Sequence, residues 1–361
     1  MKTLHNPEHA LHAPTHEFYR GRLVPAFEIP ARADFIAQAL RGSAHAAAAT
    51  ADGFEPVREF GLAPIARVHG SAYLEFIQGA WTEWQAAAAA SGVEGDPGAA
   101  FPVVWPVPGL RRDRPPANFA GRLGLYAMDS GTPLTAGSWA AAYRGAQATL
   151  SGLALLRAGE RSAYVLTRPP GHHAGADFFG GYCFINNAAV AAQAALDGGA
   201  QRVAVLDVDY HHGNGTQAIF HDRADVYFAS LHGDPMTEYP FYLGHADERG
   251  EGAGLGHNLN LPLAAGSPVA DWFAALEQAL AALGDYDPEV LIVSLGVDTY
   301  AGDPISHFGL QRPDFHALGA RLAAFGRPTL LVQEGGYATA AIGHNVRAVL
   351  DGFDHLPLAP A

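Results

Sequence analysis

The sequence predicts an α/β fold in which a mostly parallel central sheet is flanked by helices. Short runs rich in Val, Leu and Ile are apolar at nearly every position, as in parallel strands that are buried on both faces. These runs alternate with longer Ala- and Leu-rich stretches, and such alternation indicates βαβ units. The expected strands span residues 163–167, 203–209, 226–231, 290–297 and 329–333.

The helical stretches lie before, between and after these strands. They are expected at residues 72–90, 138–157, 188–196, 269–283, 313–324 and 340–350. Residues 91–121 instead carry many Gly and Pro residues and show little periodicity, which predicts a long loop that is either functional or simply solvated. Composition does not change abruptly anywhere, so residues 1–361 are expected to form a single catalytic domain with this loop as an insertion.

Composition excludes several classes of chemistry. Lys2 is the only lysine and is expected in a frayed terminus, which argues against a Schiff-base enzyme and a P-loop. Cys183 is the only cysteine, so disulfides and cysteine-rich zinc sites are excluded. A metal site would have to use His, Asp or Glu, and the chain has 18 histidines.

Charge and hydropathy restrict the partners. The net charge of −14 argues against a nucleic-acid partner and is compatible with a cationic substrate. No apolar run approaches the length of a membrane span, and no targeting segment is visible near Met1. We therefore expect a cytoplasmic protein without a membrane partner.

Polar residues and glycines follow four of the expected strands. In an open parallel sheet, ligands bind beyond the carboxyl ends of the strands, so these segments are expected to form one site. The segments are RPPGHH (168–173), DVDYHHGNG (207–215), GVDTYAGDP (296–304) and EGGY (334–337).

The run Asp207-x-Asp209-x-His211 is the most specific of these signals. In an extended chain, alternate residues share one face, so Asp209 and His211 can point at one atom. A carboxylate and an imidazole suit Zn²⁺, which in catalytic sites takes three protein ligands. Asp298, at the end of another strand, is the expected third ligand.

Three further residues on this edge have side chains suited to catalysis. A histidine of the pair His172-His173 can act as general base and acid near neutral pH. The hydroxyl of Tyr337, which follows two glycines, can donate a hydrogen bond to a developing oxyanion.

These motifs resemble those of the arginase-fold zinc deacetylases, a superfamily that includes histone deacetylases and bacterial acetylpolyamine amidohydrolases. The second group is the more similar. The similarity covers about residues 15–353 and includes EFYRGRLVPAFEIPARADFI (17–36), FGGYCFINNAAVAAQ (179–193) and SLHGDP (230–235). The resemblance implies an arginase/deacetylase-like fold and one zinc ion held by Asp209, His211 and Asp298.

The resemblance also assigns roles to other residues. His172, His173 and Tyr337 correspond to the catalytic residues, with His173 as general base and Tyr337 polarising the scissile carbonyl. Asp207 and Asn214 stand behind the two histidines. A monovalent cation, K⁺ or Na⁺, is implied at Asp207, Ser230 and Leu231. The substrate channel is implied at Tyr182, Tyr239, Gly335 and Gly336.

The sequence departs from the family pattern in two places. Asn214 stands where many histone deacetylases have Asp, and a neutral partner stabilises the imidazolium of His173 less. Polyamine-specific members carry acids in the long loop, whereas Asp113 is the only acidic residue among residues 101–122 of this chain. Ala120 aligns with the acid that recognises the substrate cation in those members. Asp129 is the candidate substitute, either as an anchor for the cation or as a contact to a substrate amide.

The resulting expectation is a zinc-dependent amidohydrolase that removes acetyl groups from acetylated polyamines or similar small cationic amines. A protein acyl-lysine deacetylase is the alternative, because the loop acid is missing. A binuclear manganese ureohydrolase and a non-catalytic binding protein fit the residues less well. The resemblance also implies a homodimer formed through the long loop, with Trp81, Trp84 and Trp105 as contributors.

Overall fold

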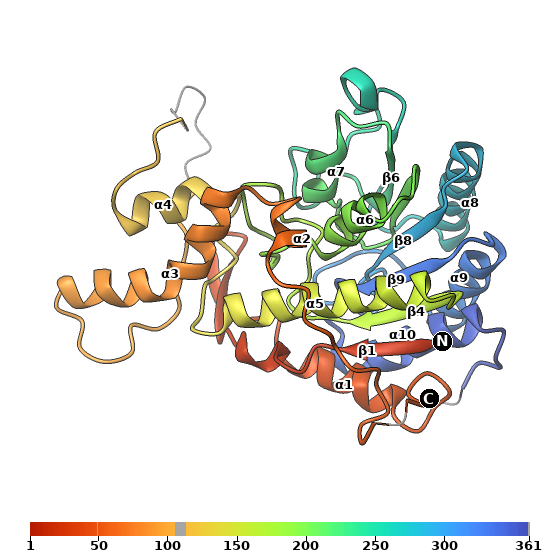
Figure 1. Cartoon of the computed structure of the whole chain (residues 1–361), viewed down its shortest axis with the longest axis horizontal. Coiled ribbons are helices and arrows are strands. Elements are labelled where there is room, and N and C mark those ends of the chain that lie inside the picture. Colours follow the sequence, from red (N-terminus) through yellow and green to blue (C-terminus); the bar gives the residue numbers. More distant parts are fainter. Residues whose placement is uncertain (49, 105–112, 360–361) are drawn as a thin grey trace.

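The computed structural model describes residues 1–48, 50–104 and 113–359 (Figure 1). A seven-stranded sheet in the order β1-β4-β9-β8-β5-β6-β7 forms its centre, and every neighbouring pair is parallel. The strands are β1 (Lys2–His5), β4 (Ser162–Leu166), β5 (Val203–Asp207), β6 (Val226–Gly233), β7 (Asn258–Leu263), β8 (Val290–Leu295) and β9 (Thr329–Gln333). A separate hairpin pairs β2 (His16–Tyr19) with β3 (Arg22–Pro25) in antiparallel fashion.

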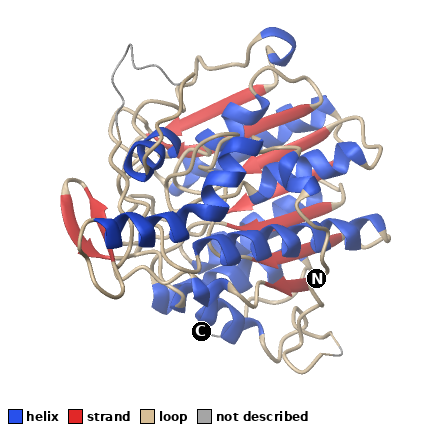
Figure 2. Ribbon diagram, turned by 60° about the vertical axis from the view of Figure 1, so that its left-hand side comes forward, coloured by secondary structure: helices blue, strands red, loops and turns tan. Residues whose placement is uncertain are grey.

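Helices cover both faces of this sheet (Figure 2). The α-helices are α1 (Ala31–Leu40), α2 (Ala63–Ala66), α3 (Ser71–Ala90), α4 (Phe119–Tyr126), α5 (Ser138–Arg157), α6 (Asn187–Asp197), α7 (Asn214–Phe220), α8 (Val269–Tyr286), α9 (Arg312–Ala324) and α10 (Thr339–Phe353). Two short 3₁₀ turns, η1 (His9–Leu11) and η2 (Gly252–Gly254), complete the described elements.

Alternate residues of strands β4, β5, β6, β8 and β9 contribute to two separate hydrophobic cores. In β4, Ala163 and Val165 pack in the core beneath α5 and α6, whereas Tyr164 and Leu166 point to the opposite core, which α1, α8, α9 and α10 cover. Successive strand side chains point to opposite faces, so burial on both faces requires an apolar residue at nearly every position. All five residues of β4 are buried, as are all five of β5 and of β9.

The structure confirms the predicted α/β fold and each strand and helix that the sequence predicts, with boundaries shifted by up to three residues. The expectation of a frayed start is wrong, because Lys2 lies in β1 and pairs with Ala163 of β4. Strand β7 and the β2–β3 hairpin were also not predicted. These strands lie at the edge of the sheet or outside it, and their polar and proline residues obscure the apolar pattern.

The described parts of the long loop, residues 91–104 and 113–118, connect two helices that extend away from the sheet, α3 and α4 (Figure 1). Its irregular backbone ends earlier than expected, because Asn118 caps α4 by accepting a hydrogen bond from the amide of Gly121. Trp84 donates a hydrogen bond to the carbonyl of Gly98, and Trp81 is half-buried on α3. Trp105 lies outside the described residues.

Within the described part of the chain, no helix combines the length and the apolar character needed to cross a bilayer.

The buried position of β1 gives a test of stability. Leu4 is fully buried in the core, so we expect Leu4→Ala to lower the free energy of unfolding by about 2–5 kcal/mol. Leu11→Ala is the matched control, since Leu11 is 52% exposed and its loss should change stability by less than about 0.5 kcal/mol. Urea unfolding followed by circular dichroism measures both. Equal stability of the two variants would contradict the assigned place of β1.

Candidate active site

Four neighbouring strands bring the polar segments of the sequence together. The strands β4, β9, β8 and β5 are consecutive in the sheet and parallel. Their carboxyl ends therefore meet along one edge, and each is followed directly by one of the four polar segments. The predicted place of the site, beyond the carboxyl ends of the strands, follows from this order.

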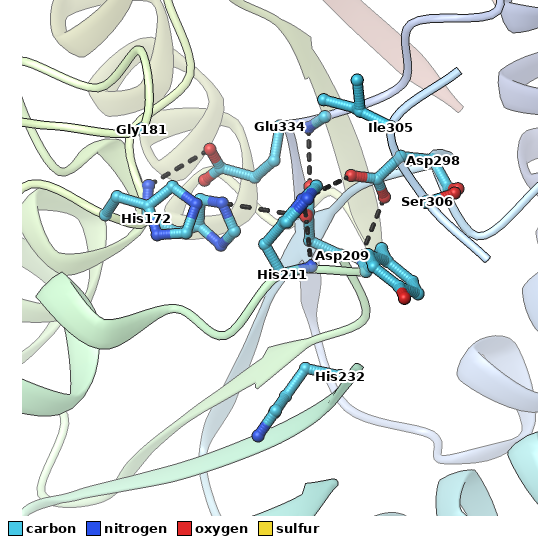
Figure 3. Close-up of polar contacts among 12 residues, drawn as sticks. His172, Gly181, Asp209, His211, His232, Asp298, Ile305, Ser306 and Glu334 are labelled. Carbon is cyan, nitrogen blue, oxygen red and sulfur yellow. Dashed lines mark hydrogen bonds and ion pairs between the residues drawn. The ribbon is translucent and has the colours of Figure 1, made fainter. Parts of the chain in front are cut away.

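Asp209, His211 and Asp298 point toward one another at this edge (Figure 3). Their ligand atoms lie within 4.8 Å of one another, and all three residues are buried. The Nδ1 atom of His211 is 3.2 Å from Oδ1 of Asp209 and 3.1 Å from Oδ2 of Asp298. Backbone amides orient both acids, because Asp298 accepts from Tyr210 at 2.9 Å and Asp209 accepts from Gly335 at 2.8 Å.

This arrangement fits a divalent metal ion. Two buried carboxylates that converge on one point repel each other unless a cation lies between them, and two carboxylates with one imidazole form a donor set that zinc accepts. Gly335 leaves room for such an ion. A Cβ atom at this position would lie 2.5 Å from carboxylate oxygens of both Asp209 and Asp298.

The tandem histidines lie beside this group and have different partners. The Nδ1 atom of His172 is 2.9 Å from the carboxylate of Asp207, and Nδ1 of His173 is 2.7 Å from the amide oxygen of Asn214. Burial alone would lower the pKa of His172, but the carboxylates of Asp207 and Asp209 raise it to about 10. Burial and the neighbouring His172 and His211 hold the pKa of His173 well below its usual value. Neighbouring carboxylates therefore favour the charged form of His172, whereas burial disfavours the charged form of His173.

Tyr337 completes the group from the end of β9. Its ring makes an edge-to-face contact with Tyr182 at 5.7 Å, and burial raises the pKa of its hydroxyl well above the usual value. The phenol therefore stays protonated and able to donate. Its backbone amide donates to Asp303 at 2.7 Å.

Arg32 on α1 supports Tyr337, and the sequence alone did not reveal this. Its guanidinium lies 4.6 Å from the centre of the Tyr337 ring and donates to the carbonyl oxygens of Glu334 and Gly336. Arg32 lies about three hundred residues earlier in the chain, so no local spacing connects it to the site. The only available signal was an arginine at an otherwise apolar helix position.

A cavity of about 780 Å³ opens above these residues. His173, His211 and Tyr337 contribute to its lining. Among the predicted channel residues, Tyr182, Tyr239 and Asp129 also line it, whereas Gly335 and Gly336 are not among its lining residues. Asp129 accepts hydrogen bonds from the hydroxyl of Tyr239 at 2.7 Å and from the backbone amide of Gly181 at 2.6 Å.

The residues assigned to a monovalent cation are fully buried and lie below the cavity, where they do not contribute to its lining. Asp207 of β5 and Ser230 of β6 are partners in the sheet register, and both are buried with Leu231. Oδ1 of Asp207 accepts from the amide of Asp209 at 3.1 Å, and the hydroxyl of Ser230 is 2.8 Å from Nδ1 of His232. Oxygen atoms of the kind that alkali cations prefer are thus adjacent here.

Comparison with known proteins identifies the family. A model of the histone deacetylase domain matches residues 26–353. The chain belongs to the histone deacetylase family. This match confirms the predicted family and class of enzyme, a hydrolytic deacetylase, and members of the family depend on a metal ion.

Named relatives within this family extend over the whole chain. Acetylpolyamine amidohydrolase 1 of Pseudomonas aeruginosa is 50% identical across 98% of this chain and 99% of its own length. The acetylpolyamine amidohydrolase of Mycoplana ramosa is 45% identical over the same shares. The crystal structure of the acetylpolyamine aminohydrolase from Burkholderia pseudomallei superposes with a TM-score of 0.88 at 40% identity, covering 99% of both chains. This superposition confirms the predicted deacetylase-like fold.

The small space beside the carboxylates gives a test of the metal centre. We expect Gly335→Ala to weaken zinc affinity at least about tenfold, because the new methyl group displaces both acids from their common point. Gly309→Ala is the control, since its Cβ would meet no atom closer than 3.8 Å. Competition with a zinc chelator of known affinity, followed by mass spectrometry of the protein-bound metal, measures the affinity of each variant. Equal zinc affinity of Gly335→Ala and Gly309→Ala would contradict the assigned position of the ion.

Proposed function

We propose that this protein is a zinc-dependent amidohydrolase that removes acetyl groups from acetylated polyamines or similar small acetylated amines and releases acetate and the free amine. One observation carries the proposal: a carboxylate-rich metal centre, a neutral histidine and a protonated tyrosine converge at one cavity. The relatives that match over the whole chain carry the name of this activity.

Each side chain has one part in the proposed reaction. A zinc ion held by Asp209, His211 and Asp298 would supply a Lewis acid that polarises an amide carbonyl and activates water. His173 is neutral, so its free nitrogen can take the proton of the attacking water. Tyr337 donates its hydroxyl hydrogen to the oxygen that becomes negative.

The second histidine supplies positive charge. His172 is held as an imidazolium against Asp207, and its ring centre lies 4.0 Å from that of His173. A fixed cation at this distance keeps His173 in its basic form before the reaction. After the proton has moved to His173, repulsion between the two rings favours its onward transfer to the leaving amine.

A second cation is proposed close to the site. A K⁺ or Na⁺ ion at Asp207, Ser230 and Leu231 would neutralise a carboxylate that lies behind His172.

We further propose a single catalytic domain over residues 1–361, a homodimer through the long loop, and a cytoplasmic location. The single cysteine, buried and without a disulfide partner, supports a reducing compartment. The alternative activity, deacetylation of protein acyl-lysine, gains no support from the relatives.

Turnover of defined substrates by the zinc-loaded protein tests this proposal. We expect faster release of acetate from acetylputrescine, acetylcadaverine or acetylspermidine than from acetyl-lysine peptides. Asp298→Ala should lose bound zinc, whereas Tyr337→Phe should keep zinc and lose about 10²–10³-fold in kcat. Two manganese ions per chain, or a preference for the peptides, would contradict the proposal, and full activity of Tyr337→Phe would remove the role given to its hydroxyl.

The neutral partner of His173 gives a pH test. In Asn214→Asp, a carboxylate replaces the amide oxygen 2.7 Å from Nδ1, and this stabilises the imidazolium and raises the pKa of His173. The base is then protonated up to a higher pH, so the acidic limb of the kcat/KM profile should move toward higher pH. Profiles of wild type and variant with one acetylated diamine measure the shift. Identical acidic limbs would show that His173 is not the titrating base.

A further inference from the structure

We propose that Glu238 binds the distal ammonium group of the substrate and thereby makes this chain selective for short acetylated diamines. The inference rests on the proposed function and names the acid that takes the place of the one missing from the long loop. It assigns a specificity residue within the cavity.

Two acids, Asp129 and Glu238, line the cavity in the described part of the chain. Both oxygens of Asp129 are occupied by structural hydrogen bonds, Oδ1 by the amide of Gly131 and Oδ2 by Gly181 and Tyr239. Asp129 thus shapes the wall of the cavity and has little capacity left for a substrate cation. Ala120, where the family pattern places its recognising acid, lies on α4 and is not among the lining residues.

Glu238 is held against the wall by its own surroundings. The residue is only 5% exposed and follows β6, where its amide donates to the carbonyl of Asp234. Gly233 makes room for the side chain, because a Cβ there would lie 2.9 Å from Cγ of Glu238 and 2.8 Å from the ring of Tyr210. Its carboxylate interacts with the hydroxyl of Tyr210 and has Arg20 as a distant ionic partner, and a buried carboxylate with so little compensating positive charge favours an ammonium ion.

The position of Glu238 favours a short substrate. The next residue, Tyr239, places its ring 5.0 Å from that of His173 and 6.1 Å from that of His211. Tyr210, which lies beside Glu238, contacts His211 with ring centres 5.1 Å apart. Glu238 is therefore adjacent in sequence to one aromatic residue of the reacting centre and lies beside a second, and we expect it to select a substrate with a short chain between the amide and the ammonium group.

Arg20 is the ionic partner that the substrate would replace. It forms the turn of the β2–β3 hairpin with Gly21, and both have positive φ. Its side chain is 56% exposed, and its guanidinium lies 3.9 Å from the carboxylate of Glu238. Such a long and exposed pair contributes little, so an incoming ammonium can compete with it.

The test compares two substrates of equal length that differ in charge, N-acetylputrescine and N-pentylacetamide, on the zinc-loaded enzyme. We expect Glu238→Gln to lower kcat/KM for the cationic substrate about tenfold or more, through a higher KM. For the neutral substrate, kcat/KM of the variant should stay within about twofold of the wild-type value. Arg20→Gln should lower KM for the cationic substrate. Asp247→Asn is the matched control, since Asp247 is an exposed acid nearby and does not line the cavity.

Binding of 1,4-diaminobutane, which has no amide to hydrolyse, to the zinc-loaded protein, measured by calorimetry, gives a second readout that does not depend on turnover. Weaker binding by Glu238→Gln, with unchanged binding by Asp247→Asn, supports the assignment. Equal losses on both substrates would assign Glu238 a structural role, and no loss on either would place recognition elsewhere. Either result would overturn the role of Glu238. The proposed function would still stand as long as the wild-type enzyme turns over acetylated amines. Absence of wild-type turnover with acetylated amines would instead contradict the proposed function.

Discussion

The site depends on two carboxylates that are buried at the same point. Asp209 and Asp298 lie at the ends of neighbouring strands, and each is almost fully buried. Their mutual repulsion in a medium of low dielectric constant is a large unfavourable energy unless a cation is present. The surrounding residues are organised around this requirement. Backbone amides of Tyr210 and Gly335 hold the two acids in place, and the missing side chain of Gly335 leaves the space between them open.

A second buried ionic group connects the amino-terminal part of the chain to this site. Glu28 accepts hydrogen bonds from Arg32 and Arg168, which are themselves buried, and Arg168 also donates to the carbonyls of His9 and His12. Arg168 begins the segment that carries the tandem histidines, while Arg32 lies against Tyr337. One carboxylate therefore fixes the position of both catalytic segments relative to each other.

Much of this architecture was predictable because the information is local. Strands such as β4 and β9 are buried on both faces and so are apolar throughout, and the residues that follow them cannot be explained by packing. The predicted zinc ligands Asp209 and His211 share one short segment, and parallel topology brings Asp298 to them. Arg32 and Glu238 were not predictable in this way. The contacts of Arg32 with the site and the proposed role of Glu238 come from contacts between distant segments, and no local spacing connects either residue to the catalytic residues. Strand β1 escaped prediction because four residues with a lysine and a histidine carry too little pattern.

The order of strands has a consequence for synthesis of the chain. Strand β9 lies between β4 and β8, so it joins the β1–β4 pair to the block formed by β8, β5, β6 and β7. It is also the strand that leaves the ribosome last. Until it emerges, two incomplete sheets have apolar edges that are open to association with other chains. The same strand brings Glu334, Gly335 and Tyr337, so closure of the sheet and completion of the catalytic group are one event. A chain that ends before β9 therefore lacks both a closed sheet and Tyr337.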